Sequence, residues 1–563
     1  MKRKILLLTV GIFATVFLNA NNLRITSGQR VNEAGDDNKV KFSIAWDNSW
    51  RVVGEPANWD AVWIFIKYKK CGVNETWKHA LLSTTMGDHT IPGNLTCDPI
   101  LTAARDGSDS NNQYDFTGHN TGIMVYRIDN NKSNIPASEI ILTVNGTAAG
   151  DKPFKDGQEY EIRVIGIEMV YVPQGQFWLG EDDGICATDP CSSTPFYKRS
   201  SKSPISSEAA IPAEYYWDGW SNNDQRLLPA SFPKGFKSFY CMKYEITQGQ
   251  FKNYMETTVP ITGDANHPFA KSGQNRNNLA TNTTPDRAQN WINWSFLKAY
   301  LDWAALRPMT ELEYEKACLG PESVRNNGLY AWGTETIIKA QYLTGTEDGT
   351  EKVATLNANC NFQQIVSINI SPGQRPAGSI DISSHSGWGG LPTYNFEALS
   401  APNCEAAPIT SAQHPNLSGA NEVFYRDWYM PIMLCGSKTG QGFGPLGAGI
   451  FARDNTLTRE TTGATYYGIM EMSGNVWEQC INVSDGTANW VPDYTGVWGD
   501  GNVNQTTGYS NVSNWDTWNN SRILKGGSWE NTVSDNRLKA TDRSNWNYQD
   551  NAASSTIGGR GVR

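Results

Sequence analysis

Apolar residues recur in short runs with the alternation of β-strands over the first third of the chain. The runs are VKFSIAW (40–46), AVWIFIKYKK (61–70), GIMVYRID (122–129), SEIILTVNG (138–146) and EYEIRVIGI (159–167). β-Branched and aromatic residues dominate these runs, as is typical of strands, and none has helical spacing. Residues 21–165 are therefore predicted to form a small all-β sandwich domain.

A different pattern begins at Met169. The segment MVYVPQGQFWLG (169–180) predicts a strand, and apolar residues at helical spacing predict a helix within 293–306. Two further helices are predicted from capping boxes, in which the cap Thr247 is followed by Gln250 and the cap Thr310 by Glu313.

Helical signals are absent from residues 321–467, which are rich in Asn, Gly, Thr and Pro and are predicted to form long loops. Residues 522–563 predict a strand, a loop and a closing strand. The expected fold class is therefore α+β and loop-rich over residues 168–563, preceded by the small all-β sandwich.

The N-terminus has the pattern of a secretory signal peptide over residues 1–20. Lys2, Arg3 and Lys4 precede a short apolar run that ends at Leu18, and cleavage is expected near Asn21, with an uncleaved anchor as the alternative. No later run is apolar for 18 residues, so no membrane span is expected in the mature chain. The expected location is periplasmic, outer-surface or extracellular, in a bacterial cell envelope.

The net charge and the cysteines indicate which ligands and which covalent links the sequence favours. The net charge of −10 disfavours nucleic-acid binding, which needs clustered Lys and Arg. Export favours disulfides among the ten cysteines. Cys71 and Cys97 are natural partners because no other cysteine lies in the first 150 residues, and Cys186 and Cys191 could form a local bridge.

Seven motifs in the same order resemble the formylglycine-generating enzyme (sulfatase-modifying factor) family. They are MVYVPQGQFWLG (169–180), KYEITQGQFKNYM (243–255), RPMTELEYEKA (307–317), LYAWG (329–333), YYGIMEMSGNVWEQC (466–480), RILKGGSW (522–529) and the final GVR (561–563). The resemblance implies a variant of the C-type lectin fold, with little regular secondary structure and often with bound calcium.

Carried over from that family, the segment MSGNVWE implies a structural calcium site. Its ligands would be the carbonyls of Ser473, Gly474 and Val476 and the side chain of Glu478; Asn359 and the carbonyl of Cys360, in ANCNF (358–362), resemble a second calcium segment. Mixed carboxylate and carbonyl oxygens suit calcium. In the alternative interpretation, Glu478 accepts hydrogen bonds from the turn amides without a metal.

The family's oxidase chemistry requires two cysteines that bind copper between the GGS turn and the C-terminal motif. Here that interval, residues 528–561, contains no cysteine, and the expected places hold Asp535 or Asn536 and Ala540 or Thr541. Because Cu(I) requires soft thiolate ligands, copper is not expected. A second branch of the fold uses iron held by histidines, but the six histidines here are scattered and predict no such site. No catalytic residues are predicted.

The C-terminal loop is instead expected to bind a ligand. Rigid aromatic side chains beside adaptable polar ones make good recognition surfaces, and Trp stacks well on sugars. The candidate residues are Trp529, Asn531, Arg543, Trp546 and Tyr548.

The leading hypothesis is an exported, non-copper protein of this fold that binds a protein or glycan partner. The alternatives are a formylglycine-generating-type oxidase with an altered metal site, and a structural envelope or extracellular matrix component.

Overall fold

The computed structural model of the chain describes most of residues 22–563. The exceptions are 32–37, 73–74, 99–118, 146–152, 156, 181–203, 213–226, 262, 322–327, 341–342, 345–351, 354, 356, 363–443, 453–457, 484–492, 516–521, 532–535, 546–547 and 549–550. The predicted signal peptide, the Cys186–Cys191 bridge, Asp535 and Trp546 lie outside the described residues.

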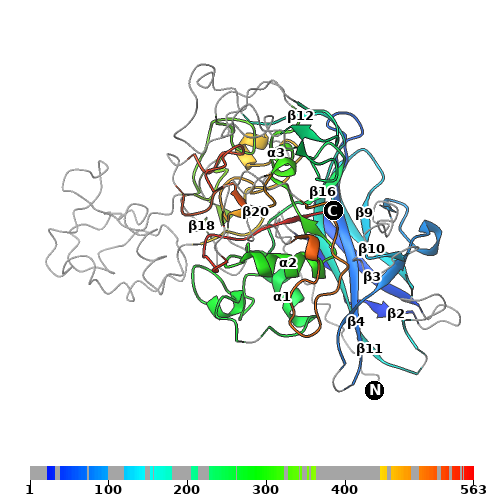
Figure 1. The fold of residues 1–563 in the computed structure, drawn as a ribbon. Coiled ribbons are helices and arrows are strands. Elements are labelled where there is room, and N and C mark those ends of the chain that lie inside the picture. The colour runs from blue at the N-terminus through cyan, green and yellow to red at the C-terminus, as the bar shows by residue number, and fades with distance from the viewer. Residues whose placement is uncertain are drawn as a thin grey trace, which may run out of the picture.

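Two sheets make up most of the regular structure (Figure 1). The first has the strand order β1-β3-β10-β6-β8, with β2 paired to β3. Its strands are β1 (Arg24–Ile25), β2 (Gln29–Arg30), β3 (Lys39–Trp50), β6 (Leu81–Ser83), β8 (His119–Asn120) and β10 (Lys132–Asn145).

The second sheet combines strands from both ends of the chain. Its order is β17-β22-β16-β11-β4-β9-β7, with β5 paired to β4. Its strands are β4 (Asp60–Lys70), β5 (Lys78–His79), β7 (Leu95–Asp98), β9 (Ile123–Arg127), β11 (Tyr160–Val172), β16 (Phe239–Met242), β17 (Arg307–Pro308) and β22 (Gly561–Val562). Every strand pair in both sheets is antiparallel.

Strand β4 is buried on both faces, which explains the apolar run from Ala61 to Ile66. Val62, Ile64 and Ile66 belong to the core shared with the first sheet. Trp63 and Phe65, on the opposite face, belong to the core shared with the helices. The side-chain alternation of one strand therefore serves two hydrophobic cores at once.

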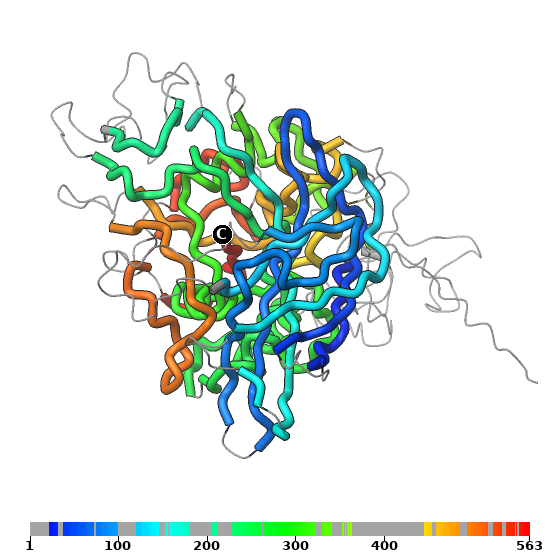
Figure 2. Tube along the Cα trace, turned by 90° about the vertical axis from the view of Figure 1, so that its right-hand side faces the viewer, coloured from blue at the N-terminus to red at the C-terminus, as the bar shows by residue number. Residues whose placement is uncertain are grey.

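The predicted sandwich packs as two layers, but the structure does not show it as a separate domain. Strand β11 pairs with β4 from Tyr160 to Val170 and then with β16 from Met169 to Val172. The boundary expected at residues 165–168 therefore falls inside a continuous strand. Figure 2 shows these N-terminal strands lying directly against the later part of the chain.

Buried polar contacts also join the two halves. Trp63 Nε1 donates to the carbonyl of Ala304 (2.8 Å). Lys67 Nζ donates to the carbonyls of Trp303 (2.7 Å) and Gly501, and lies 2.9 Å from His79 Nδ1. Burial lowers the pKa of Lys67 well below its usual value, although Asp500 and Asp302 oppose the shift.

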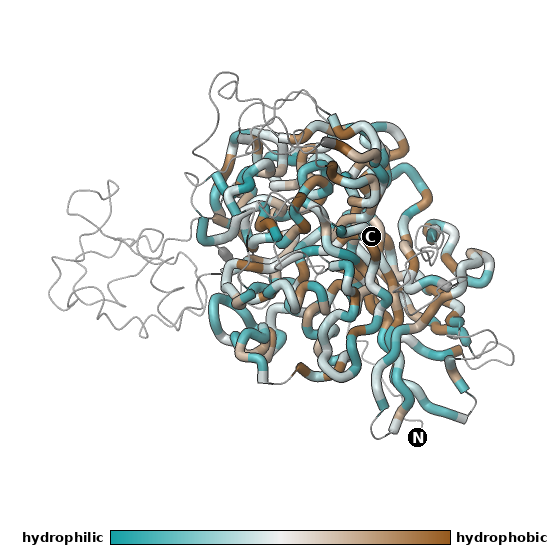
Figure 3. Tube along the Cα trace, viewed as in Figure 1, coloured by the Kyte–Doolittle hydropathy of each residue, from teal (hydrophilic) through white to brown (hydrophobic). Residues whose placement is uncertain are grey.

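The helices lie on the other side of the second sheet (Figure 1). They are α1 (Gln248–Glu256), α2 (Trp294–Trp303), α3 (Glu311–Leu319) and the short α5 (Arg459–Thr462), with 3₁₀ turns at Met86–Asp88, Pro268–Lys271 and Ser513–Trp515. Both predicted capping boxes are present, at Thr247–Gln250 and Thr310–Glu313, and α3 ends before Gly320 as predicted. Hydrophobic residues gather where the sheet meets this half, whereas the outer turns are mostly hydrophilic (Figure 3).

Two-stranded ribbons complete the α+β fold. They are β12 (Phe177–Trp178) with β13 (Pro204–Ile205), β14 (Ile211–Pro212) with β15 (Leu227–Leu228), β18 (Leu343–Thr344) with β19 (Lys352–Val353), and β20 (Glu478–Cys480) with β21 (Ile523–Lys525). No helix in the described part of the chain has the length and apolar character needed to cross a bilayer.

The predicted Cys71–Cys97 disulfide is wrong, because both thiols are free. Cys97 pairs with Val125, which pairs with Val62, whereas Cys71 follows the last residue of β4. At ~3.3 Å per residue, the stretch from 62 to 71 separates the two cysteines by roughly 30 Å along the strands. The four other cysteines in the described residues, Cys241, Cys318, Cys360 and Cys480, are also free.

A shared sheet predicts cooperative unfolding of the two halves. We expect Trp63→Ala to destabilise the protein by about 3–5 kcal/mol, the cost of truncating a buried aromatic side chain. Hydrogen exchange followed by mass spectrometry across a urea series should report one transition for the strands and for α1–α3. Val53→Ala, at a site that is 63% exposed, is the control and should have little effect. Earlier loss of protection in β3 and β10 alone would contradict the shared core.

Candidate functional site

The segment from Gly468 to Cys480 is a buried turn that ends in strand β20. Glu471, Gly474 and Asn475 all have left-handed backbone conformations, with φ values of 56°, 86° and 63°. A Cβ atom at Gly474 would lie 2.4 Å from Cys360 Sγ, so only glycine fits there.

Asn475 connects this turn to three other parts of the chain through hydrogen bonds. Its Nδ2 donates to Glu245 Oε2, and its Oδ1 accepts from the backbone N–H of Leu446 (2.8 Å) and from Asn361 Nδ2 (3.0 Å). The other Glu245 oxygen accepts from the N–H of Val476 (3.0 Å). Burial raises the pKa of Glu245 well above its usual value.

The two segments predicted to bind calcium lie side by side. Cys360 Sγ donates to the carbonyl of Ser473 (3.1 Å), and the N–H of Asn475 donates to the carbonyl of Asn361 (2.9 Å). Both segments were predicted from the sequence, and residues 363–443, most of the chain between them, lie outside the described residues.

Arg560 forms an ion pair with the Glu478 carboxylate. Its Nε and Nη2 lie 2.8 Å from the two carboxylate oxygens, and both side chains are almost completely buried. The guanidinium also donates to the carbonyls of Met242 (2.9 Å) and Met470 (2.8 Å). Burial lowers the pKa of Arg560, but the Glu478 carboxylate more than offsets this and raises it overall. Burial raises the pKa of Glu478, although Arg560 opposes that shift.

The Arg560 guanidinium places a fixed cation beside the carboxylate that a calcium ion would use, although Glu478 Oε1 has no hydrogen-bond partner among the described residues. The calcium site at Glu478 stays a prediction. Asn359 Oδ1 accepts from the N–H of Ile338 (2.8 Å), and the carbonyl of Cys360 accepts from the N–H of Ala340 (2.9 Å). Within the described ranges, no three His, Cys, Asp or Glu side chains gather in a way that could hold a metal.

Three of the five predicted ligand-binding residues face inward. Trp529 packs against Ala288 and Val476, and its Nε1 donates to the carbonyl of Ser555 (3.1 Å). Asn531 Oδ1 accepts from the N–H and hydroxyl of Ser528.

Arg543 is held by both carboxylate oxygens of Glu311. Tyr548 is half-buried, with the Arg522 guanidinium 4.8 Å from its ring centroid. Of the five candidates, Tyr548 is therefore the described residue with accessible surface.

The described positions that replace the family's copper cysteines offer no metal ligand. Ala540 is fully buried, its N–H donates to the carbonyl of Leu329 (3.0 Å), and it packs in the core with Cys318. Thr541 is buried and Asn536 is exposed. Burial raises the pKa of the core thiols of Cys318 and Cys480 well above the usual value, as is typical of structural rather than reactive cysteines.

The histidines placed by the structure make ordinary hydrogen bonds. His79 Nε2 lies against the carbonyl of Thr121, and His89 Nε2 lies 3.0 Å from the carbonyl of Ser83. His267 caps the 3₁₀ turn by accepting from the N–H of Phe269 (3.0 Å).

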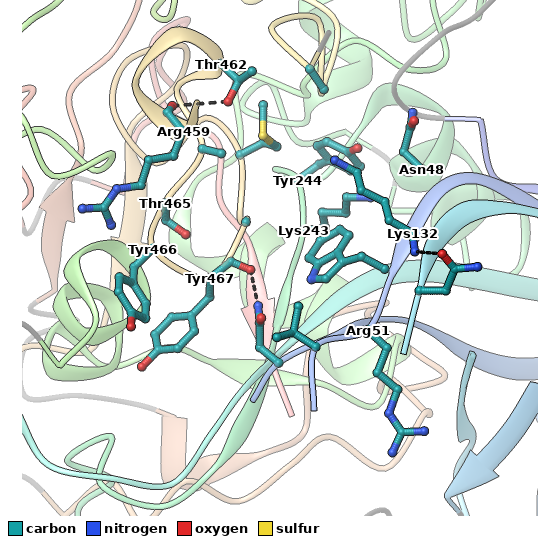
Figure 4. A pocket seen from close by; sticks show the side chains of 18 of the residues that line it. Asn48, Arg51, Lys132, Lys243, Tyr244, Arg459, Thr462, Thr465, Tyr466 and Tyr467 are labelled. Carbon is teal, nitrogen blue, oxygen red and sulfur yellow. Dashed lines mark hydrogen bonds between the residues drawn. The ribbon is translucent and has the colours of Figure 1, made fainter. Parts of the chain in front are cut away.

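A pocket of about 520 Å³ opens where the N-terminal strands meet the later half of the chain. Trp50, Arg51 and Lys132 line it from the first sheet. Lys243 and Tyr244 lie between the sheets and the segment from Thr462 to Met470, which forms the opposite wall (Figure 4). Sequence reasoning missed this pocket because its walls come from three distant stretches; the paired Tyr466 and Tyr467 were the one local signal.

If Arg560 supplies the cation at Glu478, stability should not depend on calcium. We expect the melting temperature to be the same within error in excess EDTA and in millimolar calcium. A rise of several degrees on adding calcium would contradict this. As a comparison, Arg560→Met should destabilise the fold by about 3–5 kcal/mol, because it leaves a buried carboxylate unpaired.

Glu471 should give the protein a measurable pH dependence. Its Oε1 accepts from the N–H of Gly449 (3.0 Å), and burial raises its pKa from 4.5 to about 7, although the Gly449 hydrogen bond opposes the shift. The folded state therefore binds more protons between these values, so this contribution to stability is lost as pH rises through 7.

We expect Glu471→Gln to gain roughly 1–3 kcal/mol over the wild type between pH 5 and pH 8, at 1.36 kcal/mol per pKa unit. Urea unfolding at both pH values measures the difference. Glu139→Gln, on a carboxyl group that is 63% exposed, is the control. Equal differences from wild type at both pH values would show that Glu471 is ionised in the fold.

Comparison with known protein families agrees with the sequence analysis. Residues 163–364 match the family model described as the sulfatase-modifying factor enzyme 1-like domain. No curated protein matches the chain. The match starts inside β11 and includes α1, α2, α3 and the ANCNF segment. The chain therefore contains a sulfatase-modifying factor enzyme 1-like (FGE-sulfatase) domain over residues 163–364.

Proposed function

We infer that this chain is an exported, non-copper protein of the FGE-sulfatase type that acts by binding a protein or glycan ligand. The observation that carries this proposal is the missing pair of thiols. Residues 528–561 contain no cysteine, and the described position Ala540 is fully buried in the core. A protein of this design has no soft ligands with which to hold Cu(I) in that loop.

The pocket at the junction supports ligand binding, rather than copper-dependent oxidation, as the role of this protein. Its volume of about 520 Å³ lies in the usual range of ~300–1,000 Å³ for ligand pockets. Aromatic, amide and cationic side chains line it together, which is the mixture that recognition sites use.

The C-terminal loop is the weaker candidate for the binding surface. Trp529, Asn531 and Arg543 are buried and bonded inward, so they hold the loop rather than face a partner. Tyr548 still offers part of its ring. We therefore assign ligand recognition to the pocket, and the loop serves as the comparison in the test.

The test compares binding with oxidation. Purified wild-type protein is screened on glycan arrays and in pull-downs, beside a pocket variant, Tyr466→Ala, and a loop variant, Trp546→Ala/Tyr548→Ala. We expect the pocket variant to lose at least tenfold in affinity and the loop variant to bind like wild type, because Tyr466 lines the pocket and Tyr548 does not.

In parallel, metal analysis and mass spectrometry follow a cysteine-containing sulfatase-motif peptide incubated with the protein. Stoichiometric copper together with loss of the peptide sulfur would overturn the proposal in favour of an oxidase. Equal binding by the wild type and both variants would show that the pocket is not the binding site.

A further inference from the structure

We propose that the junction pocket binds an acidic glycan, a chain of sugar rings that carries carboxylate or sulfate groups. This inference rests on the proposed function and names its ligand class. Three features of the pocket lining carry it: the sign of its charge, its aromatic rings and its amides.

The lining is cationic in a protein that is acidic overall. Arg51, Lys132, Lys243 and Arg459 line the pocket, and no Asp or Glu does so among the described residues. The whole chain, in contrast, has a net charge of −10. A local reversal of charge concentrates anions at the pocket.

The four cations differ in what surrounds them, and the Arg459 guanidinium lies 5.5 Å from the centroid of the Tyr466 ring. Lys243 is nearly buried and lies 3.3 Å from Glu168 and 3.8 Å from Asp60, so its charge is largely neutralised from behind. Arg51 donates through Nη1 to the carbonyls of Arg127 and Ile128, which hold its guanidinium without neutralising it. Lys132 is exposed and extends over the pocket toward Tyr244 (Figure 4).

Aromatic rings stand on both sides of the pocket. Trp50 lies on one side, 4.9 Å from the Lys243 ammonium. The half-buried Tyr466 lies on the other side and packs edge to face on the buried Tyr467, with centroids 4.9 Å apart, so Tyr466 offers the accessible ring. Flat rings with polar edges suit sugars, whose C–H faces are apolar and whose rims carry hydroxyl groups.

Amides supply the hydrogen bonds that hydroxyl groups need. Asn48, Asn58, Asn130 and Asn131 line the side formed by the N-terminal strands. Asn58 Nδ2 donates to the carbonyl of Tyr467, which links the two walls and fixes their spacing. Both donors and acceptors of these amides suit ligands with many hydroxyl groups.

The same chemistry points away from other anions. A nucleic acid requires a long basic surface, which the net charge of −10 disfavours. A small inorganic anion would not need a pocket of 520 Å³ with aromatic walls. A charged sugar chain uses the cations, the rings and the amides together.

The experiment uses the full chain and three probes of equal length. They are an oligogalacturonate, a chondroitin sulfate oligosaccharide and a neutral malto-oligosaccharide, titrated by calorimetry at 50 and 300 mM NaCl. We expect at least one acidic probe to bind, more weakly at the higher salt because counter-ions screen the contacts, and the neutral probe to bind at least tenfold more weakly. Oligogalacturonate carries carboxylates alone, whereas chondroitin sulfate carries carboxylates and sulfates, so stronger binding of the second probe shows that sulfate contributes to recognition.

Lys132→Gln is the critical variant, because the Lys132 side chain is exposed and lines the pocket. We expect it to weaken acidic binding at least tenfold. Lys41→Gln, a partly exposed lysine on β3 that does not line the pocket, is the matched control and should bind like wild type. Melting temperatures confirm that both variants are folded.

Two results would overturn this inference while leaving the proposed function intact. The first is neutral glycan binding that equals acidic binding and is lost in Tyr466→Ala. The second is acidic binding that Lys132→Gln does not weaken. Failure of wild-type protein to bind any glycan or protein would overturn the proposed function itself.

Discussion

Backbone hydrogen bonds between β4 and β11, from the Asp60–Val170 pair to the Lys70–Tyr160 pair, join the N-terminal strands to the FGE-sulfatase domain. Most other contacts depend on this pairing. It positions Trp63 so that its Nε1 reaches the carbonyl of Ala304 at the end of α2, and it positions Lys67 so that its Nζ reaches the carbonyl of Trp303. It also sets the spacing between the two walls of the junction pocket, which Asn58 then fastens.

The sequence predicted local structure well and long-range structure less well. Both capping boxes, at Thr247 and Thr310, depend on contacts within four residues, and the structure contains both. The separate sandwich domain was expected because period-two patterns show strands but not their partners. The apolar run at 61–66 predicted one strand of the sandwich, whereas the structure buries it on two faces. Its second layer comes from the later half of the chain.

At the candidate site, too, local features could be predicted from the sequence and long-range contacts could not. The turn at Gly474 and Asn475 could be predicted from residue types that favour left-handed conformations. Its partner could not, since Arg560 lies 82 residues from Glu478 in the sequence. The sequence also could not show that Trp529 is buried, because an isolated Trp gives no sign of whether it packs inward. The pocket is lined by residues near 50, 132 and 466, and no local sequence pattern shows that these segments lie close together.

The position of β11 in the middle of a sheet has a consequence for how the chain can be divided. Without the preceding strands, the whole length of β11 from Tyr160 to Val170 would become an unpaired edge, with Ile165 and Ile167 beside it. Such an edge is a template on which strands of other molecules add, and it leads to aggregation. The N-terminal strands therefore act as a protective cover, and a fragment cut at the limits of family similarity loses it.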